Sequence, residues 1–136
     1  MTDFITYFKM LSAFLCSLAT YFWGGIDAIF CVLLSLIAID YITGILAGIK
    51  TKTLSSEVGF YGILKKIGIL CVVALSHFIG DVSGMPEIRS LVIGFYIANE
   101  GISILENTGR LGVSLPKKLI DILSQLKDGG DDIGTQ

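Results

Sequence analysis

AIFCVLLSLIAIDYITGILAGI, residues 28–49, decides the fold of this chain: the stretch contains a single charged residue, Asp40. A helix with this sequence is apolar on every side, whereas a surface helix of a soluble domain keeps one face polar. At about 1.5 Å per residue such a helix is about 33 Å long, enough to cross a hydrocarbon core about 30 Å thick. The stretch therefore predicts a transmembrane helix.

Three further apolar runs accompany it, at residues 10–26, 67–84 and 88–105. The sequence thus predicts an all-α membrane protein with three to four transmembrane helices. The run 10–26 ends in YFWGG, residues 21–25, so it either forms a short span or lies in the membrane interface. We favour four spans, because three would require the charged N-terminal segment to be exported.

Basic residues set the predicted orientation. Eight of the ten fall in two segments, one before the third run and one after the fourth: Lys50, Lys52, Lys65, Lys66, Arg110, Lys117, Lys118 and Lys127. Two helices separate these segments, so both can lie on one side of the membrane. Because cytoplasmic loops carry an excess of lysine and arginine, we expect that side, and the C-terminus, to be cytoplasmic.

The chain divides into a transmembrane region, residues 1–112, and a C-terminal segment. Residues 113–128 are expected to form a cytoplasmic amphipathic helix. Its apolar positions recur at helical spacing: Leu115, Leu119, Ile122, Leu123 and Leu126. Gly129 and Gly130 are expected to end this helix, and residues 129–136 to form a disordered acidic tail.

Composition excludes several classes of function. A net charge of −2 is the opposite of the basic surface that binds nucleic acid. The three cysteines, Cys16, Cys31 and Cys71, lie singly in apolar runs, so we expect buried thiols without a metal. The sequence contains no nucleophile with a base and no phosphate loop, so we expect neither an enzyme nor a cofactor.

Polar residues inside the apolar runs are the candidate functional residues, since charge at the centre of a bilayer is costly. Asp40, with Thr43 one turn later, either contacts other helices or a pore, or extends to the interface. A second group recurs at helical spacing near the end of the fourth run: Asn99, Glu100, Ser103, Glu106 and Asn107. This stripe is expected to face helices or water. Gly44 and Gly48 form a GxxxG pattern, which favours close helix packing.

Several of these residues belong to motifs that resemble the bacteriophage holin family, of the toxin-secretion and phage-lysis type found in Gram-positive bacteria and their phages. DYITG at residues 40–44 is similar to its D-x-x-T-G pattern, and LSSEVG at 54–59 to its basic connection. NEGISILEN at 99–107, followed by LGVSLP at 111–116, resembles its most specific signature. The resemblance covers roughly residues 26–126.

The resemblance implies a protein that self-associates in the cytoplasmic membrane of a bacterial host and opens large non-selective lesions. Its partners would be itself and the lipid bilayer. An endolysin would leave through the lesion without needing to bind the chain, and lysis would follow at a set time. Export of a large toxin or another cytoplasmic protein is the alternative, and a small transporter subunit or membrane adaptor is a more distant one.

Overall fold

The computed structural model describes residues 1–131, which form five helices and no strand. The helices are α1 (Thr2–Trp23), α2 (Ala28–Thr51), α3 (Ser56–Ser83), α4 (Glu87–Arg110) and α5 (Lys117–Asp131). The first four are long and apolar enough to cross a membrane, which confirms the predicted fold class. That α5 is amphipathic and cytoplasmic stays a prediction.

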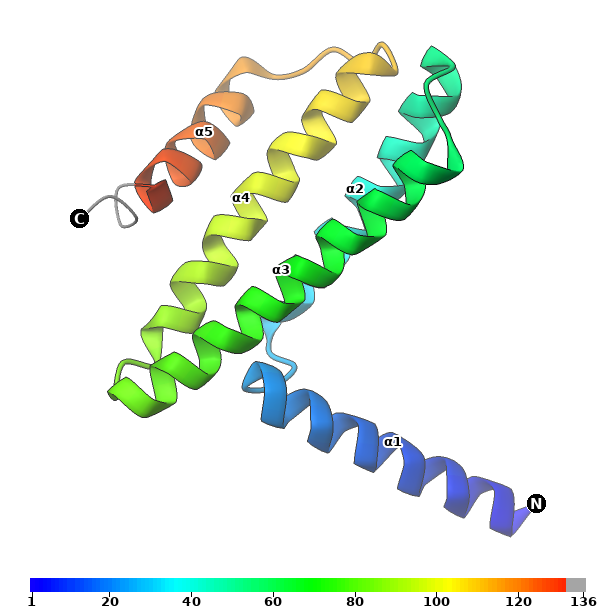
Figure 1. Cartoon of the computed structure of the whole chain (residues 1–136), viewed down its shortest axis with the longest axis vertical. Helices are drawn as coiled ribbons and strands as arrows, with labels where there is room; N and C mark the ends of the chain where they lie inside the picture. Colours follow the sequence, from blue (N-terminus) through cyan, green and yellow to red (C-terminus); the bar gives the residue numbers. More distant parts are fainter. Residues whose placement is uncertain (132–136) are drawn as a thin grey trace.

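Three of the helices, α2, α3 and α4, form an elongated bundle, and α5 runs back beside α4 (Figure 1). The first helix is arranged differently, because α1 leaves the bundle near its own C-terminal end and runs across the direction of the other helices (Figure 1). Its packing within the chain is against α3.

Local sequence explains where the helices begin and end. The Asp27 side chain accepts a hydrogen bond from the backbone N–H of Phe30 at 3.2 Å and so caps α2. Ser55 caps α3 in the same way by accepting from the N–H of Val58 at 3.2 Å. At the other end of α3, Gly84 adopts a left-handed conformation with φ of 69°, which glycine allows at little steric cost.

The helices extend beyond the apolar runs from which the spans were predicted, and the bounds of the spans stay predictions. The first helix begins at Thr2 rather than at residue 10, and α4 continues to Arg110 rather than ending at 105. The last helix begins at Lys117 and continues through Gly129 and Gly130 to Asp131. Two glycines therefore do not end it, since each costs a helix only about 1 kcal/mol relative to alanine. The rest of the predicted acidic tail, residues 132–136, lies outside the described residues.

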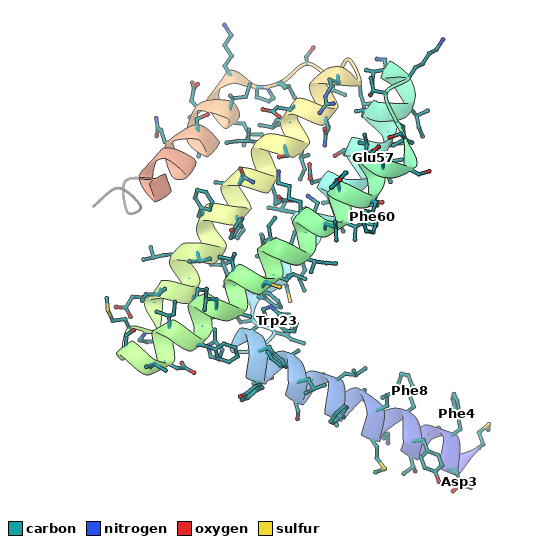
Figure 2. The ribbon with its side chains drawn as sticks, in the orientation of Figure 1. Asp3, Phe4, Phe8, Trp23, Glu57 and Phe60 are labelled. Atoms are coloured by element: carbon teal, nitrogen blue, oxygen red, sulfur yellow. The ribbon has the colours of Figure 1, made fainter. Side chains whose placement is uncertain are left out.

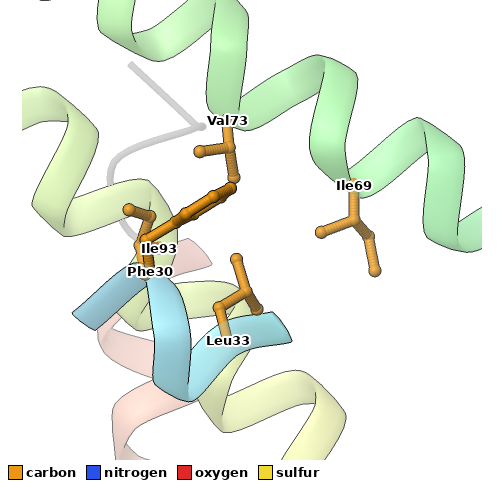
Figure 3. Packing of buried hydrophobic residues seen from close by; sticks show 5 residues of the cluster. All are labelled: Phe30, Leu33, Ile69, Val73 and Ile93. Carbon is orange, nitrogen blue, oxygen red and sulfur yellow. The ribbon is translucent and has the colours of Figure 1, made fainter. Parts of the chain in front are cut away.

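The bundle has a small buried core and an apolar exterior. Phe30 and Leu33 of α2 pack with Ile69 and Val73 of α3 and with Ile93 of α4 (Figure 3). Most other large apolar side chains are exposed on the outside of the helices, where a bilayer would cover them. The expected burial of the three cysteines inside the protein was wrong, because their thiols lie exposed on these outer faces.

Both basic segments lie at one end of the bundle. The Lys50 ammonium group at the end of α2 donates a hydrogen bond to the Leu111 carbonyl after α4, at 2.6 Å. The turn between α3 and α4, Gly84–Pro86, lies at the opposite end (Figure 1). This arrangement agrees with the predicted common side for the two segments, and the cytoplasmic assignment of that side stays a prediction.

Candidate functional site

A lysine joins the two intramembrane carboxylates. Asp40 on α2, Lys66 on α3 and Glu100 on α4 face one another, and the Lys66 Nζ contacts Asp40 Oδ2 and Glu100 Oε2. The side chains are 13%, 11% and 0% exposed, respectively. Each of the three bundle helices therefore contributes one charge to the same buried point.

Asn107 extends this contact toward the basic end of the bundle. Its Nδ2 donates to Asp40 Oδ1 at 3.0 Å and lies 3.2 Å from Thr43 Oγ1. Its Oδ1 accepts a hydrogen bond from the Arg110 guanidinium at 2.7 Å. We call these six residues the polar cluster: Asp40, Thr43, Lys66, Glu100, Asn107 and Arg110.

The polar cluster is balanced in charge but incompletely hydrogen-bonded. Two carboxylates, Asp40 and Glu100, stand against the two cations Lys66 and Arg110. Within the described part of the chain, Glu100 Oε1 is buried without a hydrogen-bond partner. A buried acceptor without a donor is costly, so water or a donor from elsewhere would stabilise this oxygen. The cluster thus holds the closed bundle together but leaves one group for which hydration is favourable.

A polar cleft of about 370 Å³ lies beside the polar cluster, between α2, α3 and α4. Besides cluster residues, its lining includes Tyr41, Gly62, Lys65, Ser103 and Glu106. At Gly62 a side chain would meet the Tyr41 ring, with a Cβ 3.5 Å from Cε2. The cleft gives the cluster an open space lined by both polar and apolar residues, between helices whose outer faces are apolar.

The structure separates the residues of the predicted stripe. Glu100 and Asn107 are buried in the cluster, Ser103 is half-buried beside the cleft, and Glu106 is exposed at the cleft. Asn99 is half-buried and, within residues 1–131, donates no hydrogen bond to the cluster. The predicted roles in helix packing or pore lining stay predictions, and the geometry favours Asp40, Glu100 and Asn107 for them.

The glycines of the GxxxG pattern face two different neighbours. At Gly44 an added Cβ would lie 3.5 Å from Asn107 Nδ2, so this glycine lets α4 approach α2 at the cluster. At Gly48 it would lie 3.2 Å from the Cβ of Leu54, in the connection to α3. The first glycine therefore serves helix packing, and the second accommodates a loop.

Sequence reasoning missed two cationic residues of the cluster. Lys66 was assigned to the basic connection, although it lies ten residues after the start of α3, which places it about 15 Å along the helix. Arg110 was counted with the C-terminal segment, yet it is the last residue of α4. The signal for Lys66 was present: the Ser55 cap, with Glu57 in the first turn, starts the helix well before the lysine.

A second ionic contact lies toward the other end of the bundle. Arg89 donates from Nη1 to Asp27 Oδ2 at 2.8 Å and from Nη2 to Asp27 Oδ1 at 3.0 Å. It also donates to the carbonyls of Trp23 and Gly25, so it binds the whole connection between α1 and α2. We call this set of contacts the Arg89 clasp. Arg89 is buried against this connection.

The Arg89 clasp predicts a pH dependence. Its hydrogen bonds lower the pKa of Asp27 below the usual value of 3.8. A lowered folded-state pKa stabilises the fold above that value, and the contribution is lost as pH falls through the lower, folded pKa. The Asp27→Asn variant should therefore unfold at a lower temperature than the parent at pH 7, and the gap should close toward pH 3. Thermal unfolding in detergent, followed by circular dichroism, measures the difference in unfolding temperature at both pH values. A gap that is constant with pH would contradict the clasp.

These features define a small polytopic helical membrane protein with a charge-balanced polar cluster between its spans. The chain belongs to the bacteriophage holin family, whose model matches residues 17–128. That family consists of membrane-pore proteins without enzymatic activity, which confirms the expected absence of catalysis. Membership supports a multi-pass location in the cell membrane. Within the described residues, no group of His, Cys, Asp and Glu could hold a metal ion.

Relatives of similar length accompany the family match. An uncharacterised 14.9 kDa protein in the nagH 3′ region of Clostridium perfringens is 41% identical over 94% of this chain and 98% of its own length. The uncharacterised Lmo0128 of Listeria monocytogenes is 44% identical over 82% of each chain. YtkC of Bacillus subtilis, also uncharacterised, is 34% identical over 82% of this chain and 84% of its own. No solved structure matches the chain.

Proposed function

We propose that this protein is a holin that accumulates in the cytoplasmic membrane, with its C-terminus in the cytoplasm, and assembles with copies of itself. At a set time the assembly opens non-selective lesions through which an endolysin reaches the cell wall. Family membership supports the membrane-pore class, and timing and endolysin release are the parts that we add.

The observation that carries the proposal is the polar cluster between α2, α3 and α4. In a single chain the charges of the cluster pair with one another, and the closed bundle presents an apolar exterior to lipid. A lesion needs a wall that faces water. Separation of the three helices would expose Asp40, Lys66 and Glu100 together, on surfaces that are unsuited to lipid but suited to a water-filled edge.

The pairing of charges in the polar cluster also predicts a threshold number of copies for opening. The cleft within one bundle is about 370 Å³, far too small for a folded enzyme, so many copies must contribute to one lesion. Opening of an isolated chain would expose its charges to lipid and is unfavourable. In an assembly, neighbouring chains share one hydrated edge, so opening becomes favourable only above a critical number of copies. This two-state behaviour gives a delay followed by an abrupt event.

The test is induced expression with and without a co-expressed endolysin. We expect growth to continue after induction, then to stop abruptly with collapse of the membrane potential, and cells with endolysin to lyse at that moment. Endolysin expressed alone is the control and should leave the cells intact. Slow leakage in proportion to the amount of protein, without endolysin release, would refute the proposal. Release of a large cytoplasmic reporter from viable cells would favour the export alternative.

A further inference from the structure

We propose that α1 does not cross the membrane but lies along its surface, on the side of the α3–α4 turn, with one face in the acyl boundary and the other in water. The proposal replaces the four spans favoured from the sequence with three, and it places the N-terminal segment on the same side as the turn. This inference is independent of the proposed holin function. It names a surface of the chain and its partner, the lipid–water interface.

The sequence of α1 is divided into two faces. At about 100° per residue, Lys9 and four small or hydroxyl residues fall within an arc of about 80°. They are Thr6, Lys9, Ala13, Ser17 and Thr20, and Ser12 and Asp3 lie on either side of this arc. The opposite arc of about 100° contains large apolar side chains, among them Phe4, Tyr7, Leu11, Phe14, Leu15 and Leu18. A helix with a lysine and hydroxyls on one face and aromatic residues on the other suits an interface rather than a bilayer core.

The direction of α1 agrees with this division. Since α2, α3 and α4 must run along the membrane normal, a helix that crosses their direction lies close to the membrane plane (Figure 1). Figure 2 shows Phe4 and Phe8 projecting from α1 toward the side on which the bundle extends, while Asp3 points the other way. The aromatic face is thus turned toward the bilayer, and the polar face away from it.

The Arg89 clasp attaches α1 between the α3–α4 turn and Leu70, which lies at the middle of α3. Arg89 is the third residue of α4, close to the turn end of the bundle, and it binds the Trp23 carbonyl at the end of α1. The Trp23 indole donates to the Leu70 carbonyl of α3 at 2.9 Å, and Gly24 ends the helix in a left-handed conformation. These contacts attach α1 to the bundle at its C-terminal end.

Away from its C-terminal end, the side chains of α1 are exposed and are not covered by other described parts of the chain. Phe4, Tyr7 and Phe14 are 74%, 71% and 60% exposed, so within residues 1–131 nothing covers their apolar face. A spanning α1 would place Lys9 and the hydroxyls in the same hydrocarbon as these aromatic residues, whereas an interfacial one separates them. The separation of the two faces therefore favours the lipid surface over a span.

Single cysteines in full-length protein test the inference. Cys16, Cys31 and Cys71 are first replaced by alanine, and cysteine is then introduced at Ala13 or Ser17 on the polar face, or at Leu11, Leu15 or Leu18 on the apolar face. Intact protoplasts, before growth stops, are treated with a membrane-impermeant maleimide. A cysteine at Ser83, beside the α3–α4 turn, reports the sidedness of the reagent.

We expect Ala13→Cys and Ser17→Cys to react at least fivefold faster than the three apolar positions, and from the same side as Ser83→Cys. Protection of all five positions would indicate either a span or burial against a second copy, and would overturn the inference. Equal reaction on both faces would indicate a helix in water, and reaction from the side opposite Ser83→Cys would indicate the wrong surface. Either result would also overturn it.

Discussion

The Lys66→Met variant is expected to lose about 3–5 kcal/mol of bundle stability, the effect of removing one partner of a buried ion pair. The lysine contacts Asp40 and Glu100 at once, and Glu100 is fully buried. Without it, two carboxylates remain close together on α2 and α4 with no cation between them. Thermal unfolding in mild detergent, followed by circular dichroism, measures the loss.

The adjacent lysine provides a matched control. Lys65 is exposed on the same turn of α3, so Lys65→Met removes the same charge and adds the same apolar side chain without breaking the cluster. We expect its effect to stay within about 0.5 kcal/mol, as for surface substitutions generally. Combining Lys66→Met with Asp40→Asn and Glu100→Gln should restore part of the lost stability. Equal losses from the two lysine variants would contradict the buried role of Lys66.

The polar cluster also shows what sequence can and cannot predict here. Uninterrupted apolar runs identified the bundle helices, because a span must be apolar on all sides. Helical spacing placed Glu100, Ser103 and Asn107 on one side of α4, and the structure has Glu100 and Asn107 in the cluster and Ser103 at the cleft beside it. Spacing along one helix does not reveal the partner on another. Lys66 therefore went unrecognised, because a pair of lysines beside a basic connection fits the positive-inside pattern equally well.

The first helix was uncertain for a different physical reason. Hydropathy averages over all sides of a helix, so α1 is apolar enough on average for a span even though Lys9 and most of its hydroxyl residues lie on one face. The direction of α1 relative to the bundle is set only by tertiary contacts, in this case the clasp between Arg89 and the α1–α2 connection. A lone arginine near the start of a helix carries no sequence signal that distinguishes such a contact from exposure to headgroups.

Neutralising one carboxylate of the cluster should bring lysis forward. In Glu100→Gln the ion pair with Lys66 becomes a weaker hydrogen bond from the same ammonium group to a neutral amide. Since 1.4 kcal/mol is a tenfold change in an equilibrium, a loss of about 1 kcal/mol makes the open bundle about fivefold more populated. Lysis should then begin at a lower membrane level of the protein and at an earlier time. Asp40→Asn should act in the same direction, more weakly, because Asn107 can still hydrogen-bond to it.

The unpartnered Glu100 Oε1 opposes this effect, because removing the charge also lowers the cost of burying that oxygen. We expect the lost ionic contact to dominate, since Lys66 serves both carboxylates and is itself almost buried. Glu106→Gln is the control: it removes the same charge from the same helix at an exposed position. Lysis onset at matched membrane levels, followed by culture density, decides between the two effects. A delayed onset in Glu100→Gln would mean that the buried charge, rather than its contact with Lys66, controls opening.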